Sequence, residues 1–134
     1  MKKILITGIA GLLGSRLADW IIKNTKHKVV GIDDLSGGFL ENINREVQFY
    51  KFNLIDLEAL KGVFEKEKID IVYHFAAYAA EGLSPFIRKY NYENNLIAST
   101  NLITCSIQYD VSRFVFASSM SVYGNKYDPP FSED

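Results

Sequence analysis

The octapeptide Thr7-Gly8-Ile9-Ala10-Gly11-Leu12-Leu13-Gly14 follows a short apolar run, Lys3–Thr7, and precedes a stretch whose apolar residues recur at helical spacing. Its glycines have the spacing G-x-x-G-x-x-G. Gly8 permits a tight turn, Gly11 lets backbone N–H groups approach a pyrophosphate, and Gly14 lets helix and strand pack closely. The partial positive charge at the start of the following helix favours the same anion. This segment therefore predicts a strand–turn–helix unit that binds a dinucleotide.

Short β-rich runs alternate with longer helical stretches along the whole chain. The expected strands are 3–7, 28–32, 47–52, 70–75 and 113–117, and the expected helices are 12–24, 56–66 with Asp56 as N-cap, and Pro85–Tyr109. This alternation implies right-handed crossovers and a parallel sheet covered by helices on both faces. We predict one α/β domain, residues 1–134, with a doubly wound (Rossmann) sheet in the order 3-2-1-4-5 that stops after its fifth strand. From Tyr123 onward the composition is typical of a loop.

Asp33 lies directly after the second predicted strand, about 20 residues beyond the glycine turn. A carboxylate at this position can accept hydrogen bonds from the hydroxyls of an adenosine ribose, and it repels a 2′-phosphate. We therefore expect NAD rather than NADP as the cofactor. The alternative is that Asp33 only caps its loop through an Asx turn, for which Asp34 is the better candidate.

The composition excludes several other classes of protein. Among 134 residues the formal net charge is -1, which gives no electrostatic basis for binding nucleic acid. One cysteine, Cys105, excludes an internal disulfide and is expected to be a buried thiol, and the two histidines, His27 and His74, predict no metal site. Because no apolar run reaches about 18 residues, we expect no membrane span and a cytoplasmic protein.

Five segments together resemble the extended short-chain dehydrogenase/reductases that act on nucleotide sugars, particularly the UDP-glucose 4-epimerases. The matching motifs follow the family's order over nearly the whole chain: TGIAGLLG (7–14), DDLSGG (33–38), HFAA (74–77), NLIASTNL (95–102) and SSMSVYG (118–124). The resemblance implies an NAD-dependent reaction on a nucleotide sugar.

The resemblance also implies a role for individual residues. The glycine turn with Leu12 and Leu13 contacts the pyrophosphate, and Asn95 lies near the nicotinamide half or, alternatively, only bonds to the backbone of a strand. Ser119 is the catalytic hydroxyl that hydrogen-bonds the reacting sugar hydroxyl, with Ser118 as its weaker neighbour. The implied cofactor contacts are Gly8, Gly11, Leu12, Leu13, Gly14, Asp33, Asp34, Ser36, Gly37, Asn53, Leu54, Phe75, Ala76, Ala77, Tyr78, Asn95 and Ser118.

Two features depart from the family pattern. Asn53, followed by Leu54, stands where the family usually has an aspartate that contacts the adenine amino group, and an asparagine can still accept that bond through its amide oxygen. The family's Tyr-x-x-x-Lys pair, in which the lysine lowers the pKa of a tyrosine base, is missing from this sequence. Tyr123 has Lys126 three residues later, which is the wrong spacing.

These observations lead to one interpretation with three alternatives. We expect the N-terminal part of a UDP-glucose/UDP-galactose type 4-epimerase, truncated before the tyrosine–lysine helix, inactive alone and self-associating through the Pro85–Tyr109 helix as a homodimer. One alternative is a nucleotide-sugar 4,6-dehydratase or decarboxylase, although dehydratases usually carry Asp-Glu where this chain has Met120-Ser121. Another is a non-catalytic NAD-binding module, and a ligand-free fold is the third.

Overall fold

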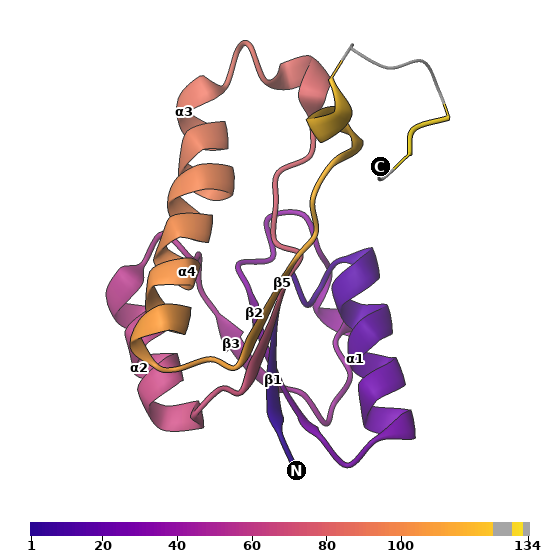
Figure 1. The fold of residues 1–134 in the computed structure, drawn as a ribbon, viewed down its shortest axis with the longest axis vertical. Helices are drawn as coiled ribbons and strands as arrows, with labels where there is room; N and C mark the ends of the chain where they lie inside the picture. Colours follow the sequence, from indigo (N-terminus) through magenta and orange to yellow (C-terminus); the bar gives the residue numbers. More distant parts are fainter. Residues whose placement is uncertain (125–129, 133–134) are drawn as a thin grey trace.

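The computed structural model describes residues 1–124 and 130–132 of the chain. Five parallel strands form one sheet, and helices flank it on both sides (Figure 1). Lys126 and the rest of 125–129 and 133–134, which belong to the predicted C-terminal loop, lie outside the described residues. The strands are β1 (Lys3–Thr7), β2 (Lys28–Asp33), β3 (Gln48–Lys51), β4 (Ile71–His74) and β5 (Arg113–Phe116), and the longer helices are α1 (Leu12–Asn24), α2 (Leu57–Glu67) and α4 (Ala98–Gln108).

The sheet order is β3-β2-β1-β4-β5, which confirms the predicted topology. Every neighbouring pair is parallel, and the register places Thr7 of β1 beside both Ile32 of β2 and His74 of β4. The carboxyl ends of the three central strands therefore meet at one edge of the sheet. The predicted strand ends differ from the observed ones by at most one residue, as where β2 extends to Asp33.

Alternation along β1 divides the core into two layers. Leu5 faces α2 and α4, where it packs with Phe64 and Leu102, whereas Ile4 and Ile6 face α1. Figure 1 shows α2 and α4 on one face of the sheet and α1 on the other. A strand that is buried on both faces has apolar residues at successive positions rather than at every second one. Ile4, Leu5 and Ile6 of β1 follow this pattern.

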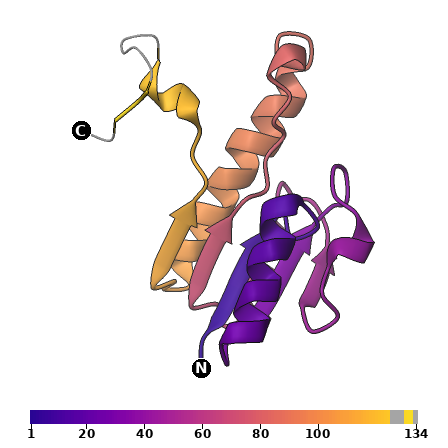
Figure 2. The ribbon, with the colours of Figure 1, turned by 90° about the vertical axis from the view of Figure 1, so that its right-hand side faces the viewer.

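The long helix begins three residues later than predicted. Pro85 lies in a turn that follows the 3-10 helix η2 (Glu81–Leu83), because the Phe86 amide donates to the Leu83 carbonyl oxygen at 2.9 Å. The helix then runs through α3 (Arg88–Asn91), a π-helical segment η3 (Tyr92–Ile97) and α4. Figure 2 shows this continuous helix reaching beyond the carboxyl ends of the strands. The amino-terminal part of this helix therefore lies beyond the edge of the sheet at which the strands end.

Two glycines allow α1 to start against the end of β1. Gly8 has a φ of 69°, and a Cβ there would lie 2.8 Å from the backbone nitrogen of Ala76. A Cβ on Gly14 would overlap the carbonyl oxygen of Gly8 and would lie 2.8 Å from its carbonyl carbon. Because both obstacles are backbone atoms, a side chain on Gly14 would move α1 away from the glycine turn, and one on Gly8 would move that turn away from the loop after β4.

His74 links β1, β4 and α4 through a chain of hydrogen bonds whose directions are fixed. The Ser99 hydroxyl donates to the Asn95 carbonyl oxygen at 2.6 Å, so it accepts from Nε2–H of His74 at 2.8 Å. Nδ1 is then an acceptor, and the Thr7 hydroxyl donates to it at 2.6 Å while accepting the Ala76 amide at 3.2 Å. This chain requires a neutral imidazole, and burial lowers the pKa of His74 from 6.5 to about 4.

We expect Gly14→Ala to lower the free energy of unfolding by about 1–3 kcal/mol, because the new methyl group overlaps backbone atoms. Gly62→Ala is the matched control, since its Cβ meets nothing within 4 Å in the interior of α2. That control should raise the free energy of unfolding by about 0.5–1 kcal/mol. Urea unfolding measures both, and equal stability of Gly14→Ala and the wild type would contradict the packing described above.

Acid should destabilise the fold through His74. The pKa of His74 is lower in the folded chain than in the unfolded chain, so the unfolded chain binds a proton first as the pH falls. The contribution of His74 to the free energy of unfolding is therefore fully present above pH 6.5 and is lost as the pH falls below it. Between pH 6.5 and 4.5 the loss should be about 2 kcal/mol. Asp34 and Glu67, whose pKa values are lowered, lose their contributions only below about pH 4.5. Urea unfolding across this range should give a flatter dependence for His74→Gln, and identical slopes would refute the assignment.

Candidate dinucleotide-binding cleft

An open cleft of about 200 Å³ lies at the carboxyl ends of the central strands. Complete small-molecule sites commonly measure about 300–1,000 Å³, so this cleft is small for a dinucleotide. It brings together residues that are far apart in the sequence: Gly8, Gly11, Ile32, Asp33, Asp34, Ser36, Gly37, Gly38, Phe52, Asn53, Leu54, Phe75, Ala76, Ala77, Tyr78, Tyr90, Asn94 and Ala98. Twelve of these are predicted contact residues, so the fold brings most of the predicted site together, and their contacts with a cofactor stay predictions.

The glycine turn forms one wall of this cleft and presents a helix start to it. Gly8 donates its amide to the carbonyl oxygen of Ile32 at 3.0 Å, which ties the turn to β2. The N-cap of α1 is Gly11, which has no side chain to cap the helix, and the first turn contains no acidic residue. The first amides of α1 are thus left for another acceptor, and the helix dipole favours a negatively charged one. These features suit a pyrophosphate.

Asp33 connects the glycine turn with the loop after β2. Its Oδ2 accepts the amide of Ala10 at 3.0 Å, and its Oδ1 accepts the amide of Leu35 at 2.8 Å. The second of these bonds is an Asx turn, and Asp34 makes the equivalent turn to the Ser36 amide at 2.9 Å. Both aspartates therefore cap the loop, whereas the sequence favoured Asp34 for that task. Each carboxylate oxygen of Asp33 keeps acceptor capacity toward the cleft.

Three polar side chains from three different segments meet at the far end of the cleft. The side-chain amide nitrogen of Asn53 donates to Oδ2 of Asp34 at 2.6 Å and to Oδ1 of Asn94 at 2.8 Å. Partial burial opposes ionisation of Asp34, but hydrogen bonds from Ser36 and Asn53 outweigh it and leave the pKa of this carboxyl below its ordinary value. The cleft thus holds one ionised carboxylate here at neutral pH.

Asn95 fixes the backbone of Tyr78, a residue that lines the cleft. Its side chain accepts the Tyr78 amide at 2.7 Å and donates to the Tyr78 carbonyl oxygen at 2.9 Å. Asn95 thus bonds to the backbone of the loop after β4 rather than to that of a strand, and its side chain is not among the groups that line the cleft. With the Phe75 amide bonded to the Thr7 carbonyl oxygen at 3.2 Å, the segment 75–78 is held at both ends.

Ser118 and Ser119 follow β5 and lie outside the lining of the cleft. Both are exposed, and Ser119 is the N-cap of a short 3-10 helix, η4 (Met120–Tyr123), where its hydroxyl oxygen accepts the Ser121 amide at 3.2 Å. Leu12, Leu13, Gly14 and Asn95 are likewise not lining residues. Gly14 has the packing role that its position predicts, and a catalytic role of Ser119 stays a prediction.

Six lining residues were not expected from the sequence: Ile32, Gly38, Phe52, Tyr90, Asn94 and Ala98. Ile32 and Phe52 stand at the ends of predicted strands, so their position was a usable signal. Tyr90, Asn94 and Ala98 come from the long helix at intervals of four residues. Helical spacing groups such residues on one face of a helix but does not say that this face lines the cleft.

Within residues 1–124 and 130–132, no group of three or more His, Cys, Asp or Glu side chains could hold a metal ion. None of the helices in this part of the chain is long and apolar enough to cross a membrane. Cys105 lies on the buried face of α4, within the core, and burial raises the pKa of its thiol, as expected for a packing residue.

Comparison with known proteins places the chain in a family. The sequence matches the profile of the NAD dependent epimerase/dehydratase family over residues 4–134. It is 36% identical to the UDP-glucose 4-epimerase of Bacillus subtilis over 138 residues, covering 98% of this chain and 40% of that protein. It is 38% identical to the dTDP-D-glucose 4,6-dehydratase of Dictyostelium discoideum over 135 residues, covering 93% of this chain and 30% of that protein.

A solved structure gives the same result. The UDP-glucose 4-epimerase of Thermotoga maritima, determined with UDP-glucose, superimposes with a TM-score of 0.89 at 35% identity, covering 94% of this chain and 41% of that one. The chain therefore spans about two fifths or less of the length of these relatives. The sheet order, the glycine turn and Asp33 agree with this match, which extends over residues 4–134. The chain belongs to the NAD dependent epimerase/dehydratase family, and NAD is the cofactor of that family.

Proposed function

We propose that this chain is the NAD-binding part of a nucleotide-sugar 4-epimerase of the UDP-glucose/UDP-galactose type. The observation that carries the proposal is the glycine turn at the uncapped start of α1, with Asp33 bonded across to the Ala10 amide of that turn. The helix start suits the pyrophosphate, and the Asp33 carboxylate suits the adenosine ribose while repelling a 2′-phosphate. Identity to epimerases over nearly the whole chain supports the same reaction class.

The residues of this chain have distinct tasks in the proposed reaction. The glycine turn and Asp33 hold and orient the cofactor, and Ser119 hydrogen-bonds the C4 hydroxyl of the sugar. When bound there, NAD would supply a reversible hydride acceptor for C4 of the sugar. The proton at that hydroxyl requires a tyrosine base with a lysine four residues later, and none of the tyrosines in this sequence has one. The chain alone is therefore proposed to be inactive.

Two other activities are kept as alternatives. The 38% identity to a dTDP-D-glucose 4,6-dehydratase favours a dehydratase, but Met120-Ser121 stand where dehydratases usually carry Asp-Glu. A non-catalytic NAD-binding module would need no tyrosine–lysine pair. Reading the gene downstream of the codon for Asp134 separates the module from both enzymes, because an open frame encoding Tyr-x-x-x-Lys supports an enzyme of this family and a stop codon supports the module.

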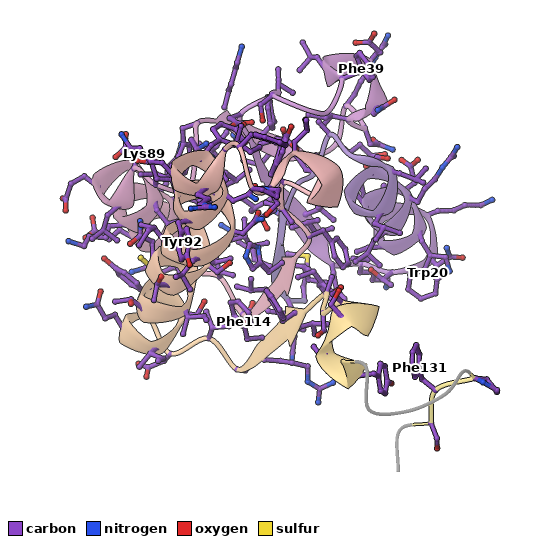
Figure 3. All side chains as sticks on the ribbon, turned by 90° about the horizontal axis from the view of Figure 1, so that it is seen from above. Trp20, Phe39, Lys89, Tyr92, Phe114 and Phe131 are labelled. Carbon is purple, nitrogen blue, oxygen red and sulfur yellow. The ribbon has the colours of Figure 1, made fainter. Side chains whose placement is uncertain are left out.

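The outer face of the long helix supports a proposed homodimer. Leu96, Ile103 and Ile107 recur at a spacing of seven and four residues, and their exposed fractions are 53%, 42% and 73%. Such a row of apolar side chains on one helix face is typical of a surface that another helix covers. Figure 3 shows Tyr92, on the same long helix, on the side of the molecule opposite to Trp20 of α1.

Isothermal titration of the purified chain should show NAD binding in the micromolar range and no binding of NADP. Asp33→Ala should weaken NAD binding at least about tenfold, because the ribose and the glycine turn both lose a partner. Glu58→Ala on the exposed face of α2 is a matched loss of a carboxylate and should leave the affinity unchanged. Equal affinity for NADP would contradict the role of Asp33, and absence of NAD binding would contradict the proposed site.

Analytical ultracentrifugation at micromolar concentration should show self-association of the wild-type chain. Ile107→Lys places a charge in the exposed apolar row of the long helix and should shift the chain toward monomer. Trp20→Lys is the control, because Trp20 is 60% exposed on α1, on the other side of the sheet. A monomeric wild type, or dissociation by Trp20→Lys alone, would count against the long helix as the interface.

A further inference from the structure

A second open hollow lies at the edge of the sheet opposite to the dinucleotide-binding cleft. Its volume is about 570 Å³, and it lies where β1, β2 and β3 begin, next to the N-terminus of the chain (Figure 2). Five of its thirteen lining residues are basic: Lys3, Lys26, His27, Lys28 and Arg45. Because the formal net charge of the whole chain is -1, this gathering of basic side chains is a local feature of the fold.

Two carboxylates also line the hollow, and one of them is already neutralised. Glu67 is buried, and its Oε2 accepts from Nζ of Lys3 at 2.8 Å while its Oε1 accepts from the Tyr50 hydroxyl at 2.5 Å. Both oxygens of Glu67 therefore have a donor from the protein, and its ion pair with Lys3 adds no net charge. Glu46, which is exposed, is left as the opposing carboxylate of the hollow.

Three cations in the lining have no internal partner. In the part of the chain that the structure describes, no carboxylate lies within 4.0 Å of the charged groups of Lys26, Lys28 or Arg45. Against Glu46, the hollow thus holds three positive charges and one negative charge. A single exposed ion pair contributes little, so an anion gains here only if it contacts two or more of these cations together.

His27 adds a hydrogen-bond donor in a fixed position. Its Nδ1 accepts the backbone amide of Lys2 at 3.2 Å, so the neutral ring carries its proton on Nε2. Its own backbone amide donates to the Thr25 hydroxyl at 3.0 Å, which fixes the loop between α1 and β2 from the other side. Among the described residues, none accepts the Nε2–H of His27. This N–H is therefore left for an acceptor that the protein itself does not supply.

The end of α1 borders the hollow, and the negative end of a helix dipole opposes an anion. Its carbonyl oxygens are partly covered by local donors. The Asn24 side chain donates to the Trp20 carbonyl oxygen at 2.8 Å, and the amide and hydroxyl of Thr25 donate to the Ile21 carbonyl oxygen at 2.9 Å and 2.8 Å. A helix end carries about half an elementary charge, which is less than the positive excess of the three cations over Glu46.

We propose that this hollow is a second anion site, which binds a small molecule through two or more linked phosphate groups. Linked phosphates suit it better than a single phosphate because its cations come from separate segments, Lys26 and Lys28 from the start of β2 and Arg45 from the turn before β3. None of the thirteen lining residues is Phe, Tyr or Trp, so the lining offers no aromatic ring of these types on which a base would stack. The phosphates, rather than a nucleoside, are therefore what the site recognises.

The test is a titration of the ¹⁵N-labelled chain with inorganic pyrophosphate, followed by the amide signals in NMR spectra. Saturating NAD is present, so that the cleft at the other edge of the sheet is occupied. The signals of residues 26–28 and 45–48 should move with a saturable dependence, whereas those of residues 8–14 should stay in place. ADP should produce the same changes with an affinity within about threefold of that of pyrophosphate.

Charge variants test the assignment of the cations. Lys26→Gln and Arg45→Gln should each weaken pyrophosphate binding about threefold, and the double variant about tenfold. Lys23→Gln is the matched control, because Lys23 lies in the last turn of α1 and outside the lining, and it should leave the affinity unchanged.

Three results would overturn the inference: no movement of the signals of residues 26–28 and 45–48, an equal loss of affinity in Lys23→Gln and Arg45→Gln, or ADP binding more than tenfold tighter than pyrophosphate. The signals of residues 26–28 decide the outcome whether or not NAD binds. Failure of this site is therefore distinguishable from failure of the proposed cofactor site.

Discussion

The close approach of α1 to the end of β1 is the constraint on which the rest of the structure depends. Gly14 lies against the backbone of Gly8 with no space for a Cβ, and Gly8 in turn lies against the backbone of Ala76. These contacts bring a helix start, the glycine turn and the loop after β4 to one point. An uncapped helix start placed there offers its amides and the positive end of the helix dipole to an anion. A looser packing would leave these amides exposed to water.

Around that point, side chains hold the walls of the cleft before any ligand arrives. The chain from Ala76 through Thr7 and His74 to Ser99 joins β1, β4 and α4, and Asn95 holds Tyr78 from the same helix. Buried polar networks of this kind are costly when one partner is missing, so all members must be present together. Fixing these walls on folding reduces the conformational entropy lost on binding, which is the general benefit of a preorganised site.

Much of the site follows from strand ends, and the part that does not comes from the long helix. Gly8, Gly11, Asp33 and the segment 75–78 stand where parallel strands end, and parallel strands place such residues together. Pro85 suggested a helix start but lies in a turn that the hydrogen bond from the Phe86 amide to the Leu83 carbonyl oxygen closes, and the helix begins at Arg88. Asn94 lines the cleft from the long helix, and helical spacing alone does not say which face of that helix lies beside the cleft.

The sequence by itself determined the α/β class, the strand order and the dinucleotide turn, because these depend on local apolar runs, on glycine spacing and on the handedness of crossovers. Only the tertiary structure decided which way the Asn53 amide points and that His74 is a neutral, hydrogen-bonded link. An amide or an imidazole can donate or accept, and the choice belongs to partners that are distant in the chain, such as Asp34 and Asn94 for Asn53, or Thr7 and Ser99 for His74. Hydrogen-bond direction is a property of the assembled network, so no stretch of sequence contains it.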